Sequence, residues 1–196
     1  MQALLWRDYL CPWCYLGRDR TALMQRLGVE IVPMGYELHP EVPFGGRTHR
    51  PGGRLDQLLD HIAAECDQVG LPFRKPSHTP NTRRVLEIAE VLRTQQPESL
   101  SSFDEACYRA HWVTGGDLGD LDELGRIVSA SGASWPSVHE QLNGGLGAEL
   151  LGESMKTAHG VGVMATPAWW VDDRLLIPGV QPRETIERWI GRLRDR

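Results

Sequence analysis

The 196-residue sequence contains no long hydrophobic run and no surplus of positive charge. No stretch approaches the roughly 18 consecutive apolar residues that a membrane-spanning helix needs. The 26 Asp and Glu residues outnumber the 21 Lys and Arg residues, which gives a formal net charge of −5. Because proteins that bind nucleic acids or anionic membranes usually carry a basic surface, neither class of partner is expected.

The sequence is also poor in cysteine and has no segment typical of secretion. Residues 1–7 lack the basic region and the apolar stretch of about 7–15 residues that make up a secretion signal, so a cytoplasmic protein is expected. Four cysteines are too few for a disulfide scaffold in a chain of this length. In a reducing compartment, a closely spaced pair such as Cys11 and Cys14 instead indicates catalysis or metal binding.

The residues that are present suffice for a folded domain. With 41% hydrophobic and 24% charged residues the chain can bury a core, and its length allows one domain or a core with an inserted subdomain. Apolar patterns predict a strand over residues 3–9, a helix directly after Cys11-Pro12 that ends at Leu27, and a second strand over residues 30–36. The chain therefore opens as a βαβ unit.

The end of the chain has the same mixed character, whereas the middle is helical. Two strands are predicted over residues 168–171 and 174–177, joined by a hairpin turn at Asp172-Asp173. An amphipathic helix follows from Gln181 to Leu193. A loop-like stretch at residues 45–51 precedes a series of predicted helices. Their apolar faces, or their start and stop residues, lie at 55–69, 85–92, 102–110, 120–132 and 146–159. We interpret Ser102–Glu105 as a capping box that opens the third of these helices.

The sequence Cys11-Pro12-Trp13-Cys14 stands between the first predicted strand and the first predicted helix. A thiol at the amino end of a helix lies near unpaired N–H groups and the positive end of the helix dipole, both of which favour the thiolate. The thiolate is the species that attacks in disulfide exchange, and a thiol three residues later lies one turn away, within reach of the first. Pro12 helps to fix the backbone between the cysteines, and the dipeptide Pro12-Trp13 tunes their redox balance.

Several segments resemble a known family. Cys11-Pro-Trp-Cys-Tyr-Leu-Gly17 after a strand, and Ala165-Thr-Pro167 before a strand, resemble the two active-site segments of a thioredoxin-fold oxidoreductase. The resemblance is closer to the FrnE-like subgroup of the DsbA family and covers nearly the whole chain. The further segments that carry it are GYELHPEVP at residues 35–43, NTRR at 81–84, HWVTGGD at 111–117 and PGVQP at 178–182.

The resemblance implies an α/β protein with a thioredoxin-like core, residues 1–45 and 146–196, and an all-helical insertion, residues 46–145. It implies that Cys11 is the nucleophile, that Cys14 is the resolving thiol and that Pro167 is a cis-proline facing them. Thr166 would offer backbone groups to an extended substrate, in the manner of strand addition.

The implied activity is that of a thiol–disulfide oxidoreductase that needs no cofactor. Its substrate would be a protein or small-molecule thiol or disulfide, with glutathione as one possibility. Trp169-Trp170 stands where the family has a smaller apolar pair.

Two other functions remain open. Kappa-class glutathione transferases and 2-hydroxychromene-2-carboxylate isomerases share a thioredoxin core with a helical insertion, but they activate glutathione with a serine at the position of Cys11 and lack a counterpart of Cys14. The other alternative is a non-catalytic peptide-binding or chaperone module. It would use the groove near Pro167 and apolar surface at the paired Trp169 and Trp170.

No metal site is expected. Tetrahedral zinc needs four ligands, no second Cys-x-x-Cys accompanies the first, and the seven His residues lie at least ten residues apart. The basic run Arg47-Thr-His-Arg50, with Arg54, is either a solvated linker or a contact for an anionic substrate such as glutathione.

Four further residues allow two interpretations each. Cys66 and Cys107 lie on apolar helix faces, where packing in the core is favoured over a second redox pair. Asp8 is either a proton acceptor or a structural anchor at the end of a strand, and the anchor is favoured. Trp13 either covers the dithiol or packs at the surface.

Overall fold

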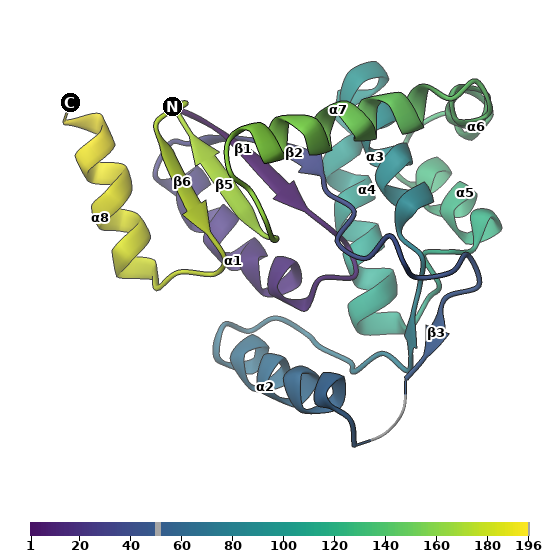
Figure 1. The fold of residues 1–196 in the computed structure, drawn as a ribbon, viewed down its shortest axis with the longest axis horizontal. Helices are drawn as coiled ribbons and strands as arrows, with labels where there is room; N and C mark the ends of the chain where they lie inside the picture. Colours follow the sequence, from purple (N-terminus) through teal and green to yellow (C-terminus); the bar gives the residue numbers. More distant parts are fainter. Residues whose placement is uncertain (50–51, 196) are drawn as a thin grey trace.

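The computed structural model describes residues 1–49 and 52–195. Its strands form a four-stranded sheet in the order β2-β1-β5-β6 and a separate two-stranded pair, β3-β4 (Figure 1). They are β1 (Gln2–Arg7), β2 (Glu30–Gly35), β3 (Arg47–Thr48), β4 (His78–Thr79), β5 (Ala168–Val171) and β6 (Leu175–Pro178). Because β1 pairs in parallel with β2 and antiparallel with β5, the two ends of the chain meet in one sheet.

Side chains of β1 point alternately to the two faces of this sheet, and each face is covered by helices. The helices are α1 (Pro12–Arg26), α2 (Arg54–Gln68), α3 (Arg83–Gln95), α4 (Pro97–Arg109), α5 (Leu121–Ala130), α6 (Trp135–Asn143), α7 (Leu146–Gly160) and α8 (Arg183–Arg194), with a π-helical turn, η1 (Ala110–Thr114). Ala3 and Leu5 pack with residues of α1 and α8, whereas Trp6 packs with Ala158 of α7. This period of two is that of a strand covered on both sides.

A second hydrophobic cluster joins α1 to the helices in the middle of the chain. It contains Tyr15 and Leu16 of α1 together with Leu59 of α2, Phe103 of α4 and Trp112 of η1, all at most 1% exposed. Helix α1 therefore has two apolar sides, one against the sheet and one against the helical part. Since the cysteine motif lies at the start of α1, it stands at the junction of the two.

The division into core and insertion stays a prediction. Helix α7 falls in the range 146–196 that was predicted as core, yet it packs on both α3 and β2. It therefore contacts both predicted parts of the chain, and the packing gives no clear boundary at residues 145–146.

The predicted elements agree with the structure where the signals were local, with one clear error. The interpretation of Ser102–Glu105 as the start of a helix is wrong, because α4 begins at Pro97. A proline is favourable in the first turn, so the helix is already formed when it reaches Ser102. The start at Asp120 is confirmed, since its carboxylate caps the first turn of α5. The sequence patterns did not indicate α6, η1 or the β3-β4 pair.

Candidate active site

Strand β1 leads directly to the Cys-Pro-Trp-Cys motif at the amino end of α1. Cys11 is the N-cap residue, with extended backbone angles (φ −77°, ψ 114°), and Pro12 follows in the first turn. The Cys11 carbonyl accepts hydrogen bonds from the N–H groups of Cys14 (3.0 Å) and Tyr15 (3.2 Å), which start the helix. The Cys11 side chain makes no capping hydrogen bond. Its sulfur lies at the amino end of the helix, where the helix dipole favours negative charge.

The two sulfur atoms are nearly inaccessible and differ in acidity. Cys11 is 2% exposed and Cys14 is 3% exposed, and both are free thiols. A hydrogen bond from the Cys14 thiol lowers the pKa of Cys11, against the effect of burial, and a contact with Thr166 lowers it further. Burial raises the pKa of Cys14 well above its ordinary value, and the interaction with Cys11 adds to this. Cys11 is therefore the more acidic of the two thiols and ionises before Cys14.

The segment before β5 lies against the motif. The Thr166–Pro167 peptide bond is cis, and Cys11 Sγ lies 3.4 Å from the Thr166 carbonyl oxygen. The buried Thr166 hydroxyl has no hydrogen-bond partner among the described residues. Gly17, one turn after Cys14, permits this approach, because a Cβ there would lie 3.1 Å from Pro167 Cγ. The fold thus brings the four predicted site residues Cys11, Cys14, Thr166 and Pro167 together.

Cys11 lines a cavity of about 560 Å³ that also contacts the helical part of the chain. Trp13, Leu55 and Leu58 contribute to its apolar wall. Its polar lining includes His39, Arg47, His49, Thr79 and His111. An apolar cavity with a few polar groups is typical of a site for a small molecule or an extended side chain.

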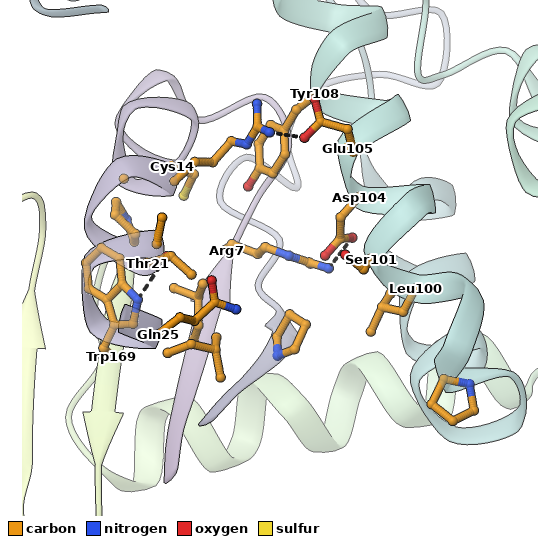
Figure 2. Close-up of a pocket in the computed structure, with 18 residues that line it drawn as sticks. Arg7, Cys14, Thr21, Gln25, Leu100, Ser101, Asp104, Glu105, Tyr108 and Trp169 are labelled. Carbon is orange, nitrogen blue, oxygen red and sulfur yellow. Dashed lines mark hydrogen bonds and ion pairs between the residues drawn. The ribbon is translucent and has the colours of Figure 1, made fainter. Parts of the chain in front are cut away.

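Cys14 lines a different cavity, of about 430 Å³, between α1 and α4 (Figure 2). Its polar lining includes Arg18 from α1 and Glu105 and Tyr108 from α4. Arg18 and Glu105 form an ion pair at its edge. The two cysteines of the motif therefore face separate cavities.

Asp8 is buried beside the motif and held by backbone groups. Its carboxylate accepts hydrogen bonds from the N–H groups of Leu38 (2.8 Å) and Leu10 (3.3 Å). Burial raises its pKa from 3.8 to about 6. These contacts tie the end of β1 to the segment after β2, which favours the structural interpretation of Asp8.

Cys66 and Cys107 are fully buried in the hydrophobic cluster around α1. Burial raises the pKa of Cys66 to about 11 and the pKa of Cys107 well above its ordinary value. Since a thiol that stays protonated is a poor nucleophile, these surroundings favour a packing role for both residues.

The tryptophans near the site have different surroundings. Trp13 is half-buried, packs against the ring of His61 with 5.9 Å between centroids, and also lines the Cys11 cavity. Trp169 is fully buried, whereas Trp170 is half-buried and donates its N–H to Asp173 (3.0 Å). Neighbouring residues of a strand point to opposite faces. The expectation of apolar surface shared by Trp169 and Trp170 is therefore wrong.

The basic run contributes Arg47, Thr48 and His49 to the lining of the Cys11 cavity. Arg47 lines the Cys11 cavity, and its side chain donates a hydrogen bond to the carbonyl of Glu41 (2.6 Å). Arg54 is exposed at the start of α2, and Arg50 lies outside the described residues.

The sequence did not indicate the histidines of the Cys11 cavity. His39, His49 and His111 come from separate parts of the chain, so no local spacing pointed to them. All three lie in segments that the sequence analysis had singled out, at residues 35–43, 47–50 and 111–117, but none of them was named as a site residue. In the described part of the chain, no group of three or more His, Cys, Asp or Glu side chains could hold a metal ion. No helix there is long and apolar enough to cross a membrane.

The fold is similar to several solved structures of low sequence identity. A probable DsbA oxidoreductase from Streptomyces coelicolor has a TM-score of 0.84 at 22% identity, over 98% of this chain and 89% of that one. A 2-hydroxychromene-2-carboxylate isomerase has a TM-score of 0.78 at 21% identity, over 98% and 96%. The cytosolic disulfide reductase DsbM from Pseudomonas aeruginosa, in a structure with GSH, has a TM-score of 0.67 at 15% identity, over 100% and 98%.

The sequence itself gives the family. No protein of curated function matches it. A family model described as a DSBA-like thioredoxin domain matches residues 4–191, from the first strand into the last helix. Because this match spans almost the entire sequence and the sheet and helices have the corresponding fold, the chain belongs to the DSBA-like thioredoxin domain family.

Proposed function

We propose that the protein is a thiol–disulfide oxidoreductase that acts through a mixed disulfide on Cys11. The observation that carries the proposal is the asymmetry of the two thiols: the pKa of Cys11 is lowered at a helix N-cap, and the pKa of Cys14 is raised beside it. Membership of the family and the likeness to oxidoreductase folds support redox chemistry in general.

In the reducing direction, the Cys11 thiolate attacks a substrate disulfide. A bond forms between Cys11 and one substrate sulfur, and the other substrate sulfur leaves as a thiolate. Cys14 then loses its proton and attacks Cys11, which frees the second substrate sulfur and closes the Cys11–Cys14 disulfide. The substrate is reduced and the enzyme dithiol is oxidised. In the oxidising direction, a substrate thiolate attacks Cys11 of the enzyme disulfide and the same steps run in reverse.

Thr166 and Pro167 are the proposed docking segment. Ala165 and Thr166 line the Cys11 cavity, so a substrate there would meet their backbone within reach of the sulfur. An extended peptide can pair with such backbone groups as an added strand does.

The proposed substrates are protein or small-molecule thiols and disulfides, glutathione among them. Arg47 and His111 line the Cys11 cavity and supply N–H donors for a carboxylate, whereas the ring nitrogens of His49 are engaged by the Pro76 carbonyl and the Thr79 hydroxyl. The likeness to DsbM, whose structure contains GSH, supports a substrate of this size, and its cytosolic description is compatible with the cytoplasmic location that we propose.

A trapping experiment tests the proposal. In Cys14→Ser the mixed disulfide on Cys11 cannot be resolved, so mass spectrometry of the protein from cell extract should show an adduct on Cys11 that a reductant removes. Cys11→Ser, the matched variant, should carry no adduct. If the two variants carry the same adducts, the proposed role of Cys11 is wrong.

The likeness to a 2-hydroxychromene-2-carboxylate isomerase keeps a glutathione-dependent isomerase as a second candidate. That chemistry needs one activated thiol or thiolate and no resolving partner. Isomerase or transferase turnover that persists in Cys14→Ser would support it. Loss of all turnover in Cys14→Ser would support the oxidoreductase.

A further inference from the structure

The two cavities divide the cysteine motif between them. The cavity at Cys11 is the one that a substrate would enter, whereas the cavity between α1 and α4 reaches only Cys14 of the pair. Cys14 lines the α1 side of that cavity and Tyr108 lines the α4 side. Figure 2 shows the hydroxyl end of the Tyr108 ring directed toward Cys14. This second cavity has no part in the chemistry described so far.

Cys14 must lose a proton before it can resolve a mixed disulfide, and its position makes that loss difficult. Its side chain is 3% exposed and belongs to the hydrophobic cluster around α1. A substrate attached to Cys11 would occupy the cavity on the Cys11 side. The proton therefore needs another route, and a donor that stabilises the new thiolate would make the loss easier.

We propose that the cavity between α1 and α4 is the route by which the proton leaves Cys14, and that the Tyr108 hydroxyl donates a hydrogen bond to the Cys14 sulfur as the thiolate forms. This inference rests on the proposed role of Cys14 as the resolving thiol. The cavity, at about 430 Å³, has room for several water molecules, each of which occupies roughly 30 Å³ in the liquid. The lining of this cavity includes the exposed residue Ser101, so the cavity opens to solvent there.

Tyr108 fits the role of donor better than that of base. Its side chain is 4% exposed. Burial raises its pKa well above the ordinary value, and a charge on Cys14 raises it more than any other neighbouring group does. The phenol therefore keeps its proton while Cys14 ionises. Since Asp8 lines neither cavity, water in the cavity between α1 and α4 is the acceptor.

The other charged groups around Cys14 balance one another except for Cys11 and Asp8. They come from α1, β1 with the loop after it, and α4, and they are Cys11, Arg18, Arg7, Asp8, Asp104 and Glu105. Arg18 pairs with Glu105, and Arg7 pairs with Asp104. Thr166 and Pro167, which face the motif from the β5 side, carry no charge. The Thr166 side chain and the Asp8 backbone also lower the pKa of Cys14, and Tyr108 adds a neutral donor from the α4 side.

The Cys14 proton passes to cavity water and on to bulk solvent, while Tyr108 keeps its own proton. The Cys14 sulfur forms a bond to the Cys11 sulfur, and the bond between Cys11 and the substrate sulfur breaks. The two enzyme thiols are oxidised to a disulfide, and the substrate sulfur leaves as a thiolate that solvent can protonate.

The reaction of the full-length reduced protein with dithiobis(nitrobenzoate) separates the two thiols. Attack by Cys11 releases a first nitrothiobenzoate, and attack by Cys14 on the mixed disulfide releases a second. In Tyr108→Phe we expect the second phase to slow about tenfold near neutral pH and its pH midpoint to move upward, with the first phase changed by less than about twofold. Ser101→Trp, which narrows the cavity at an exposed position, should slow the second phase severalfold in the same way.

Tyr15→Phe is the matched control. Tyr15 is a neighbouring buried tyrosine whose hydroxyl donates to the carbonyl of Pro72, so its removal should leave the second phase unchanged. A normal second phase in both Tyr108→Phe and Ser101→Trp overturns the inference, as does an equal effect on both phases. If Tyr108→Phe fails to fold, Ser101→Trp decides alone. Absence of the first phase in the unmodified protein would instead overturn the proposed function.

Discussion

At Cys11, the stability of the thiolate depends mainly on one neighbouring donor, the thiol of Cys14. Cys14→Ala removes this donor, so we expect the pKa of Cys11 to rise and its alkylation by iodoacetamide near neutral pH to slow severalfold, by roughly the effect of one hydrogen bond to a charged group. Cys14→Ser keeps an O–H donor and should lie between Cys14→Ala and the unmodified protein. Alkylation rates measured by peptide mass across a pH series give the pKa of Cys11 and its reactivity in each protein. Identical profiles for the two variants would show that the hydrogen bond is not the cause.

Asp8 makes the stability of the fold depend on pH. Burial raises its pKa from 3.8 to about 6, so the folded protein binds this proton more tightly than the unfolded chain does. Its contribution to stability is therefore complete below about pH 4 and is lost as the pH rises through about 6. We expect this group to lower the free energy of unfolding by about 3 kcal/mol over that window.

Urea unfolding of the unmodified protein and of Asp8→Asn at several pH values measures this effect. The comparison is made through the difference in unfolding free energy between the two proteins, because other titrating groups then cancel. A difference that stays flat between about pH 4 and pH 7 would contradict the assignment of a raised pKa to Asp8.

At the scale of single elements, an ion pair links β1 to α4. Arg7 Nη2 lies 2.5 Å from Asp104 Oδ1, and the Arg7 side chain is 4% exposed. Asp104→Asn would leave a buried guanidinium without its counter-charge, which is expected to destabilise the protein by about 3–5 kcal/mol. Glu105→Gln, at the next position of α4, breaks an exposed pair with Arg18 and should cost only about 0–1 kcal/mol. Urea unfolding compares the two variants, and equal losses would contradict the argument.

The elements that the sequence predicted correctly are those with local causes. The turn at Asp172–Asp173 is one example: both residues adopt positive φ (51° and 53°), which Asp tolerates better than most residues. The π-helical turn η1 is a counter-example, because it depends on distant packing. Trp112 in that turn donates its N–H to the carbonyl of Tyr9 (2.8 Å), far away in the sequence.

The candidate site shows the same limit. The motif Cys11–Cys14 was evident from spacing, and Thr166–Pro167 was placed beside it by resemblance. Tyr108 carried no signal of its own, and His49 was noted only as part of a basic run. The positions of both in the cavities depend on how α4 and the β3-β4 pair pack around α1. Sequence patterns give the reactive atoms, whereas tertiary packing decides what surrounds them.

At the scale of the whole molecule, α1 connects the sheet to the helical part, and this predicts how the protein unfolds. Each of the three hydrophobic clusters contains a fully buried tryptophan: Trp112 in the cluster around α1, and Trp169 and Trp6 on the two faces of the sheet. Tryptophan fluorescence therefore reports on all parts of the core. Circular dichroism is dominated by the helices.

Helix α1 packs on one side in the cluster with the middle helices and on the other side in a cluster with the sheet. If either cluster is lost, the packing of α1 in the other cluster is weakened and its apolar residues become exposed. We therefore expect the fluorescence and circular dichroism transitions in urea to coincide. Leu59→Ala in α2 and Ile186→Ala in α8 should each lower both midpoints together, with losses of about 2–5 kcal/mol. If Leu59→Ala instead splits the curve into two steps, the helical part unfolds on its own, and contact through α1 is too weak to couple it to the sheet.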